Sequence, residues 1–222
     1  AYVVRVPRSE QQLIEAVQKL LAEQEQLYQQ ENAELPRIHF DRHLYQPLLI
    51  EMPEKVQMVP PGLHESETRF VRDLRDYWNV EKHRVLAGKE IFLLRNQSHG
   101  YGISFFEERR FFPDFILWVV DQSCQRIIFI EPHGMLYAKA YIHDEKARLH
   151  ERLPELAKEI GKRSKRGDIA LDSYIISATS FEDLRQRYDD GTWDREKFAK
   201  RHILFPERSP QYDYLKKLFE EN

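Results

Sequence analysis

The chain has 222 residues, a formal net charge of −3, 41% hydrophobic residues and one cysteine. These values exclude global disorder, a wholly basic histone-like binder, an acidic tail and a disulfide framework. The longest uninterrupted apolar run is six residues, 115–120, which is too short to span a bilayer. We therefore predict a protein of the reducing cytoplasm with no membrane partner.

Residues 1–64 differ in pattern from the remainder of the chain. Residues 9–31 are rich in Gln and Glu and carry apolar residues at helical spacing, which predicts one amphipathic helix. Five prolines interrupt residues 33–64 and predict an irregular arm that packs on another surface. We therefore predict two units, an N-terminal helix and arm over 1–64 and a compact α/β domain over 65–222.

The predicted elements of the second unit follow the order helix, strands, helix, strand. Ser66 is the predicted N-cap of its first helix. Periodicity predicts helices over 66–80, 143–162, 181–188 and 212–219, and strands over 91–95, 103–106, 115–120, 126–131 and 173–178. The strands over 115–120 and 126–131 are apolar on both faces, which is typical of the centre of a covered sheet.

The strongest chemical signal lies at one end of these two central strands. Asp114 precedes the first strand and Glu131 ends the second. If Val120 pairs with Gln125 across the turn, Asp114 lies directly opposite Glu131, with Cβ atoms about 4.5–5.5 Å apart. His133 shares their face if the strand continues. A slip of one residue would instead place the two carboxylates on opposite faces.

Two carboxylates this close repel each other unless a cation or a proton lies between them. Mg²⁺ (or Mn²⁺) suits a site rich in oxygen and free of cysteine, because Mg²⁺ is usually held by one or two carboxylates, water and phosphate. A metal held in this way activates water and stabilises charge on a phosphate. We therefore predict metal-dependent chemistry at Asp114, Glu131 and His133.

A second signal is the positive charge near the end of the helix predicted over 143–162. Residues 139–166 hold nine Lys and Arg against five Asp and Glu. Either these cations contact DNA phosphates or the helix end is simply solvated. The candidate DNA-binding residues are Lys139, Lys162, Arg163, Lys165 and Arg166.

The Pro-Asp at 113–114 and the acid at 131, on these elements, resemble the PD-(D/E)xK nuclease superfamily over about residues 65–180. The resemblance implies a restriction-endonuclease-like core of helix, three-stranded meander, helix and strand. It implies Mg²⁺-dependent hydrolysis of DNA, with Asp114 and Glu131 as metal ligands. It also implies Glu67 on the first helix as a ligand or as a group acting through water, and the Pro132 carbonyl as an extra ligand.

The chain departs from this family at one position, because His133 stands where the family has lysine. His133 can replace the lysine as a base, an acid or a ligand. Alternatively, catalysis is lost and the fold serves DNA binding or protein docking. A third reading is a relocated lysine, for which Lys146 on the following helix is the candidate.

A narrower resemblance is carried by residues 43–49, 60–63, 66–67, 93–96 and 112–118. These segments are similar to the C-terminal region of bacterial DEAD/DEAH-box helicase proteins related to type III restriction subunits. The similarity implies DNA and a helicase module of the same parent protein as partners. The chain has no P-loop or D-E-A-D run and begins at Ala1 rather than methionine, so we expect it to be the nuclease-like part of a longer protein.

Overall fold

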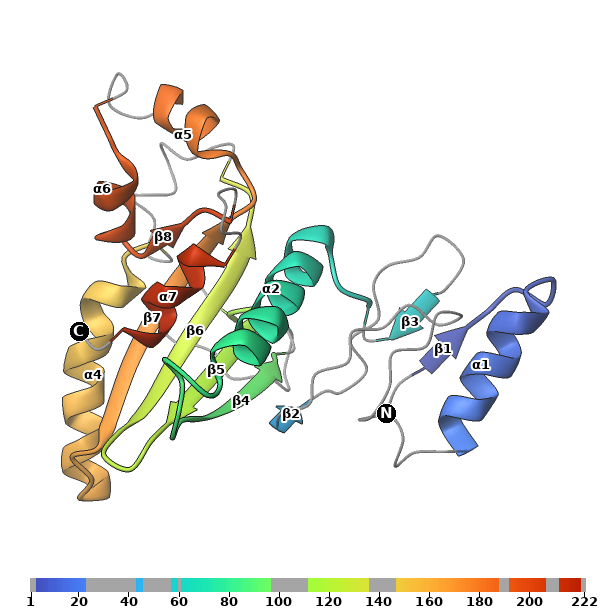
Figure 1. Cartoon of the computed structure of the whole chain (residues 1–222), viewed down its shortest axis with the longest axis horizontal. Coiled ribbons are helices and arrows are strands. Elements are labelled where there is room, and N and C mark those ends of the chain that lie inside the picture. Colours follow the sequence, from blue (N-terminus) through green and yellow to red (C-terminus); the bar gives the residue numbers. More distant parts are fainter. Residues whose placement is uncertain are drawn as a thin grey trace.

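The computed structural model describes residues 3–22, 43–45, 57–59, 61–96, 112–135, 147–187, 192–206 and 212–220. Its centre is a six-stranded mixed sheet in the order β2-β4-β5-β6-β7-β8, with helices packed on it (Figure 1). The predicted mixed α/β class is therefore confirmed. The strand predicted over 103–106 lies outside the described residues.

The core of the sheet is an antiparallel meander followed by a parallel strand. The meander consists of β4 (Glu90–Arg95), β5 (Phe115–Val120) and β6 (Gln125–His133). After helix α4 (Leu149–Ser164), β7 (Ile169–Ser177) runs parallel to β6. Such a parallel return requires a crossover, which the helix provides.

The turn between β5 and β6 is built around Asp121. Its Oδ1 accepts backbone N–H bonds from Ser123 at 2.8 Å and Cys124 at 2.9 Å, and its Oδ2 lies 3.1 Å from Nζ of Lys89. The hydrogen bonds from Ser123, supported by those from Lys89 and Cys124, hold the pKa of Asp121 well below its ordinary value. This turn pairs Val120 with Gln125, the predicted register.

Helices cover both faces of the sheet and create two apolar cores. α2 (Glu65–Glu81) and α7 (Asp213–Phe219) pack on one face, where Phe70 lies 5.4 Å from Phe115 between ring centroids. α4 (Leu149–Ser164) packs on the other face through Leu149, Leu153 and Ala157. This double cover explains why the central strands are apolar on both sides.

A smaller aromatic cluster supports the outer edge of the sheet. α5 (Phe181–Arg187) and α6 (Arg195–Ala199) pack with β8 (Ile203–Leu204), which runs parallel to β7. Phe181, Phe198 and Phe205 meet edge to face in this cluster. No helix within the described ranges is long and apolar enough to cross a membrane.

The N-terminal part contributes both to a separate ribbon and to the main sheet. β1 (Val3–Arg5) pairs antiparallel with β3 (Gln57–Val59), and α1 (Gln11–Ala22) lies beside them (Figure 1). β2 (His43–Tyr45), which falls inside the predicted arm, instead runs parallel to β4. The main sheet therefore includes a strand from the N-terminal side of the predicted boundary at residue 64.

Two helix starts differ from the sequence prediction. α2 begins at Glu65 with His64 as its N-cap, because the side chain of Glu67 accepts a 2.7 Å bond from the His64 N–H. Ser66 is therefore not the cap. α4 begins at Leu149 and continues past Pro154, while residues 143–146 of the predicted helix lie outside the described residues.

Candidate functional site

The candidate site lies at the end of the β5–β6 pair. The β5–β6 pairing ends at Phe115 and Ile130, and Asp114 and Glu131 are the next positions outward on the two chains. Both alternate with residues that face α2, so their side chains lie on the α4 side of the sheet. Asp114 is half-buried and Glu131 is 7% exposed. The predicted register is confirmed as far as Phe115 and Ile130, and the two carboxylates follow on one face at the end of the strand pair.

Asn96, directly after β4, holds the backbone at Asp114. Its N–H donates to the Asp114 carbonyl at 2.8 Å, and its side-chain amide donates to the Pro113 carbonyl at 2.9 Å. Asn96 therefore holds the backbone of residues 113 and 114, next to one of the two carboxylates, against the end of β4.

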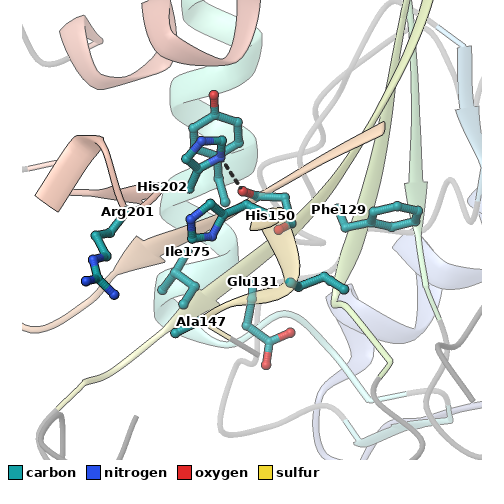
Figure 2. Close-up of a pocket in the computed structure, with 10 residues that line it drawn as sticks. Phe129, Glu131, Ala147, His150, Ile175, Arg201 and His202 are labelled. Atoms are coloured by element: carbon teal, nitrogen blue, oxygen red, sulfur yellow. Dashed lines mark hydrogen bonds between the residues drawn. The ribbon is translucent and has the colours of Figure 1, made fainter. Parts of the chain in front are cut away.

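Glu131 forms part of the wall of a small cavity between β6, β7 and α4, which also has His150 and His202 in its lining. The cavity holds about 10 Å³, room for about one water. Figure 2 shows the Glu131 carboxylate directed away from both imidazoles. This cavity therefore separates Glu131 from the histidines and is not itself a substrate pocket.

His133 is the last residue of β6 and is exposed. The strand continues through it, with Glu131 opposite Ile175 and His133 opposite Ser177, so His133 shares the face of Glu131. Its carbonyl accepts a 2.9 Å bond from the Ala178 N–H, which anchors the strand end. Its imidazole is therefore open to solvent two residues beyond the Glu131 carboxylate.

The two residues that the family resemblance adds have structural partners. The Pro132 carbonyl accepts a 3.1 Å bond from the Ser66 hydroxyl, which leaves a second lone pair on that oxygen. Glu67, 7% exposed, binds the His64 N–H and lies 3.6 Å from the guanidinium of Arg95. Glu67 belongs to α2, on the opposite face of the sheet from Glu131.

The basic residues lie far from this carboxylate pair. Lys162, Arg163, Lys165 and Arg166 end α4 beside the β5–β6 turn, at the opposite end of β6 from Glu131. Six residues of strand separate Gln125 from Glu131, which is about 20 Å. The sequence places these cations just after the acidic centre, whereas the crossover helix carries them to the other end of the sheet. Lys139 and Lys146 lie outside the described residues.

A buried polar cluster at the open edge of β7 was not predicted. Asp172, 6% exposed, lies 2.5 Å from Nη2 of Arg126 and 2.8 Å from Nδ1 of His202. The His202 ring stacks between Tyr174 at 4.5 Å and His150 at 4.3 Å. Asp172 interrupts the mostly apolar strand at 169–177, and a charged residue in such a strand usually has a partner of opposite charge. This position was therefore a signal in the sequence for a buried ion pair. Nothing in the sequence indicated its distant partners.

His202 is held in one tautomer and one backbone conformation. Its Nδ1 also lies 3.0 Å from the Ser173 carbonyl (dashed line in Figure 2), which can only accept, so Nδ1 carries a proton. Its φ of 57° is in the left-handed region, which costs a non-glycine residue energy. The bonds to Ser173 and Asp172 offset that cost. Hydrogen bonds from His202 and Arg126 outweigh the effect of burial and lower the pKa of Asp172.

We expect His150 to make stability depend on pH. Burial, and then the neighbouring His202, lower the pKa of His150 from its ordinary value of 6.5. The unfolded chain therefore takes up this proton first, and the free energy of unfolding falls as pH drops below about 6.5. His150→Phe keeps a ring on His202 but cannot titrate, so its stability should fall less than that of the wild type. Urea unfolding of both proteins between pH 7 and pH 5 measures the difference. If the free energy of unfolding changed with pH equally in both proteins, His150 would not be the source of the pH dependence.

No protein-family model, curated protein or solved structure matches this chain. Within the described segments, no three His, Cys, Asp or Glu side chains converge as a metal cluster. The opposed pair of Asp114 and Glu131 nevertheless fits Mg²⁺, which commonly takes one or two carboxylates and completes its shell with water. The chemistry of the site is therefore argued from its own geometry.

Proposed function

We propose that this chain hydrolyses DNA phosphodiester bonds with Mg²⁺ or Mn²⁺ at the carboxylate pair. The observation that carries the proposal is the β5–β6 register, because the next positions beyond the pair of Phe115 and Ile130 are Asp114 and Glu131. His133 adds an exposed imidazole on the same face. Two carboxylates and a histidine on one rigid strand end form a suitable set for orienting a metal, a phosphate and a water.

In this proposal each residue has a separate role. Asp114 and Glu131 hold the metal, which supplies charge stabilisation for the phosphate and lowers the pKa of bound water. The free lone pair of the Pro132 carbonyl adds an oxygen ligand. His133 orients or deprotonates the attacking water, in place of the family lysine. Glu67 acts only through water, because its carboxylate already caps α2.

The order of the elements supports membership of the PD-(D/E)xK superfamily. α2, the β4-β5-β6 meander, α4 and the parallel β7 follow the order that this resemblance implies. We further propose that the chain is the nuclease part of a longer helicase or restriction protein. Lys146 remains the candidate for a relocated lysine should His133 prove dispensable.

A second candidate function is nucleic-acid binding or protein docking without cleavage. The observation that favours it is the separation of the basic residues on α4 from the carboxylate pair by about 20 Å of strand. A protein that only binds DNA needs the cations and not the carboxylates. It would bind DNA equally well with and without divalent metal.

The two functions separate in one assay on the purified chain. We expect cleavage of plasmid and single-stranded DNA in Mg²⁺ or Mn²⁺, and none in EDTA, because the opposed carboxylates act only through a metal. Gel electrophoresis over a time course measures the products. Binding of DNA with no cleavage in either metal would support the second function and contradict the first.

A further inference from the structure

A groove of about 900 Å³ runs along α4, the edge of β7 and the β5–β6 turn. It lies away from the carboxylate pair, which does not line it. Its floor includes Asp172, Arg126 and the two stacked histidines, His150 and His202. β8 pairs with Ile175 and Ile176, and among the described residues no strand lies beyond the earlier part of β7, where the groove opens.

Positive charge dominates this groove. Its lining contains six Lys and Arg, which are Lys89, Arg126, Lys158, Lys162, Lys165 and Arg166, and two acidic residues, Asp121 and Asp172. Each acidic residue already has a cation: Lys89 lies 3.1 Å from Asp121 and Arg126 lies 2.5 Å from Asp172. The acids of the floor are therefore neutralised and do not repel an anion.

Three lysines remain as the groove's uncompensated charge. Lys158, Lys162 and Lys165 are exposed along α4, and no carboxylate in the described part of the chain forms an ion pair with them. The nearby Arg163 and Arg166, in contrast, lie 3.9 Å from Glu159 and 2.5 Å from Asp168.

The spacing of these lysines indicates the shape of the ligand. From Lys158 to Lys165 the helix rises about 10 Å, at about 1.5 Å per residue. One phosphate group cannot contact both ends, whereas a nucleic-acid strand repeats its phosphate every 3.4 Å or so along a duplex. We propose that this groove binds the phosphate backbone of a nucleic acid, with the α4 lysines as its phosphate contacts.

This binding surface goes beyond the proposed hydrolysis. Its lysine-rich end, beside the β5–β6 turn, lies about 20 Å from Glu131 along β6, whereas His150 and His202 in its floor border the small cavity that Glu131 lines. Binding in the groove requires neither metal nor cleavage. The floor gives it rigidity, because Asp172 fixes both Arg126 and His202 at the edge of β7. The groove therefore holds a strand in a constant position relative to the carboxylate site.

The test is DNA binding in EDTA, where no metal-dependent cleavage occurs. The variant Lys158→Ala/Lys162→Ala/Lys165→Ala removes the three contacts, and the control Arg185→Ala/Lys197→Ala/Lys200→Ala removes three charges from α5 and α6. We expect the groove variant to bind a labelled oligonucleotide about tenfold or more weakly than the wild type, and the control to bind within about twofold. The salt slope of log K should flatten by about 2 for a single strand.

Fluorescence anisotropy from 50 to 200 mM salt gives both quantities. An equal loss of DNA affinity in the two variants would show that only net charge matters, and it would overturn the proposed binding groove. Equally tight binding of polyglutamate or anionic lipid vesicles would also overturn it, because the surface would then not select a nucleic acid. All the substituted side chains are exposed or half-exposed, and circular dichroism checks that both variants remain folded.

The same proteins separate this proposal from the proposed hydrolysis. A wild-type chain that binds DNA through the α4 lysines but cuts none in Mg²⁺ supports the groove and contradicts the nuclease. A chain that cuts DNA while the groove variant binds as the wild type does supports the nuclease and contradicts the groove.

Discussion

Asp114→Asn and Glu131→Gln should each reduce metal-dependent DNA cleavage by about a hundredfold or more. Both substitutions preserve size and the β5–β6 register but remove the charge that holds a cation. The opposed carboxylates repel each other without metal, so each variant should be at least as stable as the wild type in EDTA. Loss of activity would therefore occur without loss of fold.

A thermal-shift measurement gives a second readout that does not depend on cleavage. Mg²⁺ should raise the melting temperature of the wild type, because a ligand that binds only the folded state stabilises it, and should not raise that of either variant. Glu155→Gln on α4 is the matched control, since it removes an exposed carboxylate far from the pair. If both site variants cleave DNA as fast as this control, the assignment of Asp114 and Glu131 is wrong.

Asp172→Ala should strongly destabilise the folded protein. It leaves Arg126, whose side chain is 13% exposed, without its buried counter-ion, and it removes a bond that holds His202 in a left-handed conformation. Breaking one partner of a buried ion pair costs about 3–5 kcal/mol. We expect a loss of this size in the free energy of unfolding measured with urea.

Two comparison variants give this prediction its control. Asp168→Ala breaks an exposed pair with Arg166, which water screens, and should change the urea midpoint far less. The double variant Arg126→Met/Asp172→Leu replaces both charges by apolar groups and should recover much of the stability. If Asp172→Ala had the same urea midpoint as the wild type, the buried pair of Arg126 and Asp172 would contribute nothing to stability.

Acid should weaken the same cluster. Burial alone would raise the pKa of Asp172, but the hydrogen bonds from His202 and Arg126 outweigh it and lower that pKa below its ordinary value of 3.8. A group with a lowered pKa in the folded state stabilises the protein above its unfolded pKa. That contribution is lost as pH falls through the folded pKa. The wild type should therefore lose more stability below about pH 4 than Asp172→Ala does.

Local pattern predicted most of the central sheet correctly. The apolar runs gave β5 and β6 to within two residues, and the turn residues 121–124 indicated their register, because a short hairpin leaves few ways to pair two strands. Opposition of Asp114 and Glu131 followed from that register alone. The start of α2 was wrong by one residue because the Glu67 carboxylate binds the His64 N–H and Ser66 instead reaches the Pro132 carbonyl.

The long-range arrangement could not be read from the chain. Residues 162–166 follow the acidic centre by some thirty positions, yet α4 runs back along the sheet and places them at its far end. The cluster of Arg126, Asp172 and His202 joins three segments, and only the tertiary structure brings them together. β2, read as part of an irregular arm, pairs with β4 through contacts distant in sequence.

The sequence by itself determined the apolar pattern of the central strands and the β5–β6 hairpin, and hence where Asp114 and Glu131 lie. These features depend on bonds between residues that are close in the sequence. The tertiary structure decided where the positive charge lies, which carboxylate is buried with a guanidinium, and which edge of the sheet opens as a groove. Those features depend on the path of the crossover helix and on where β8 ends. A net charge of −3 therefore conceals an acidic strand end and a basic groove at opposite ends of one sheet.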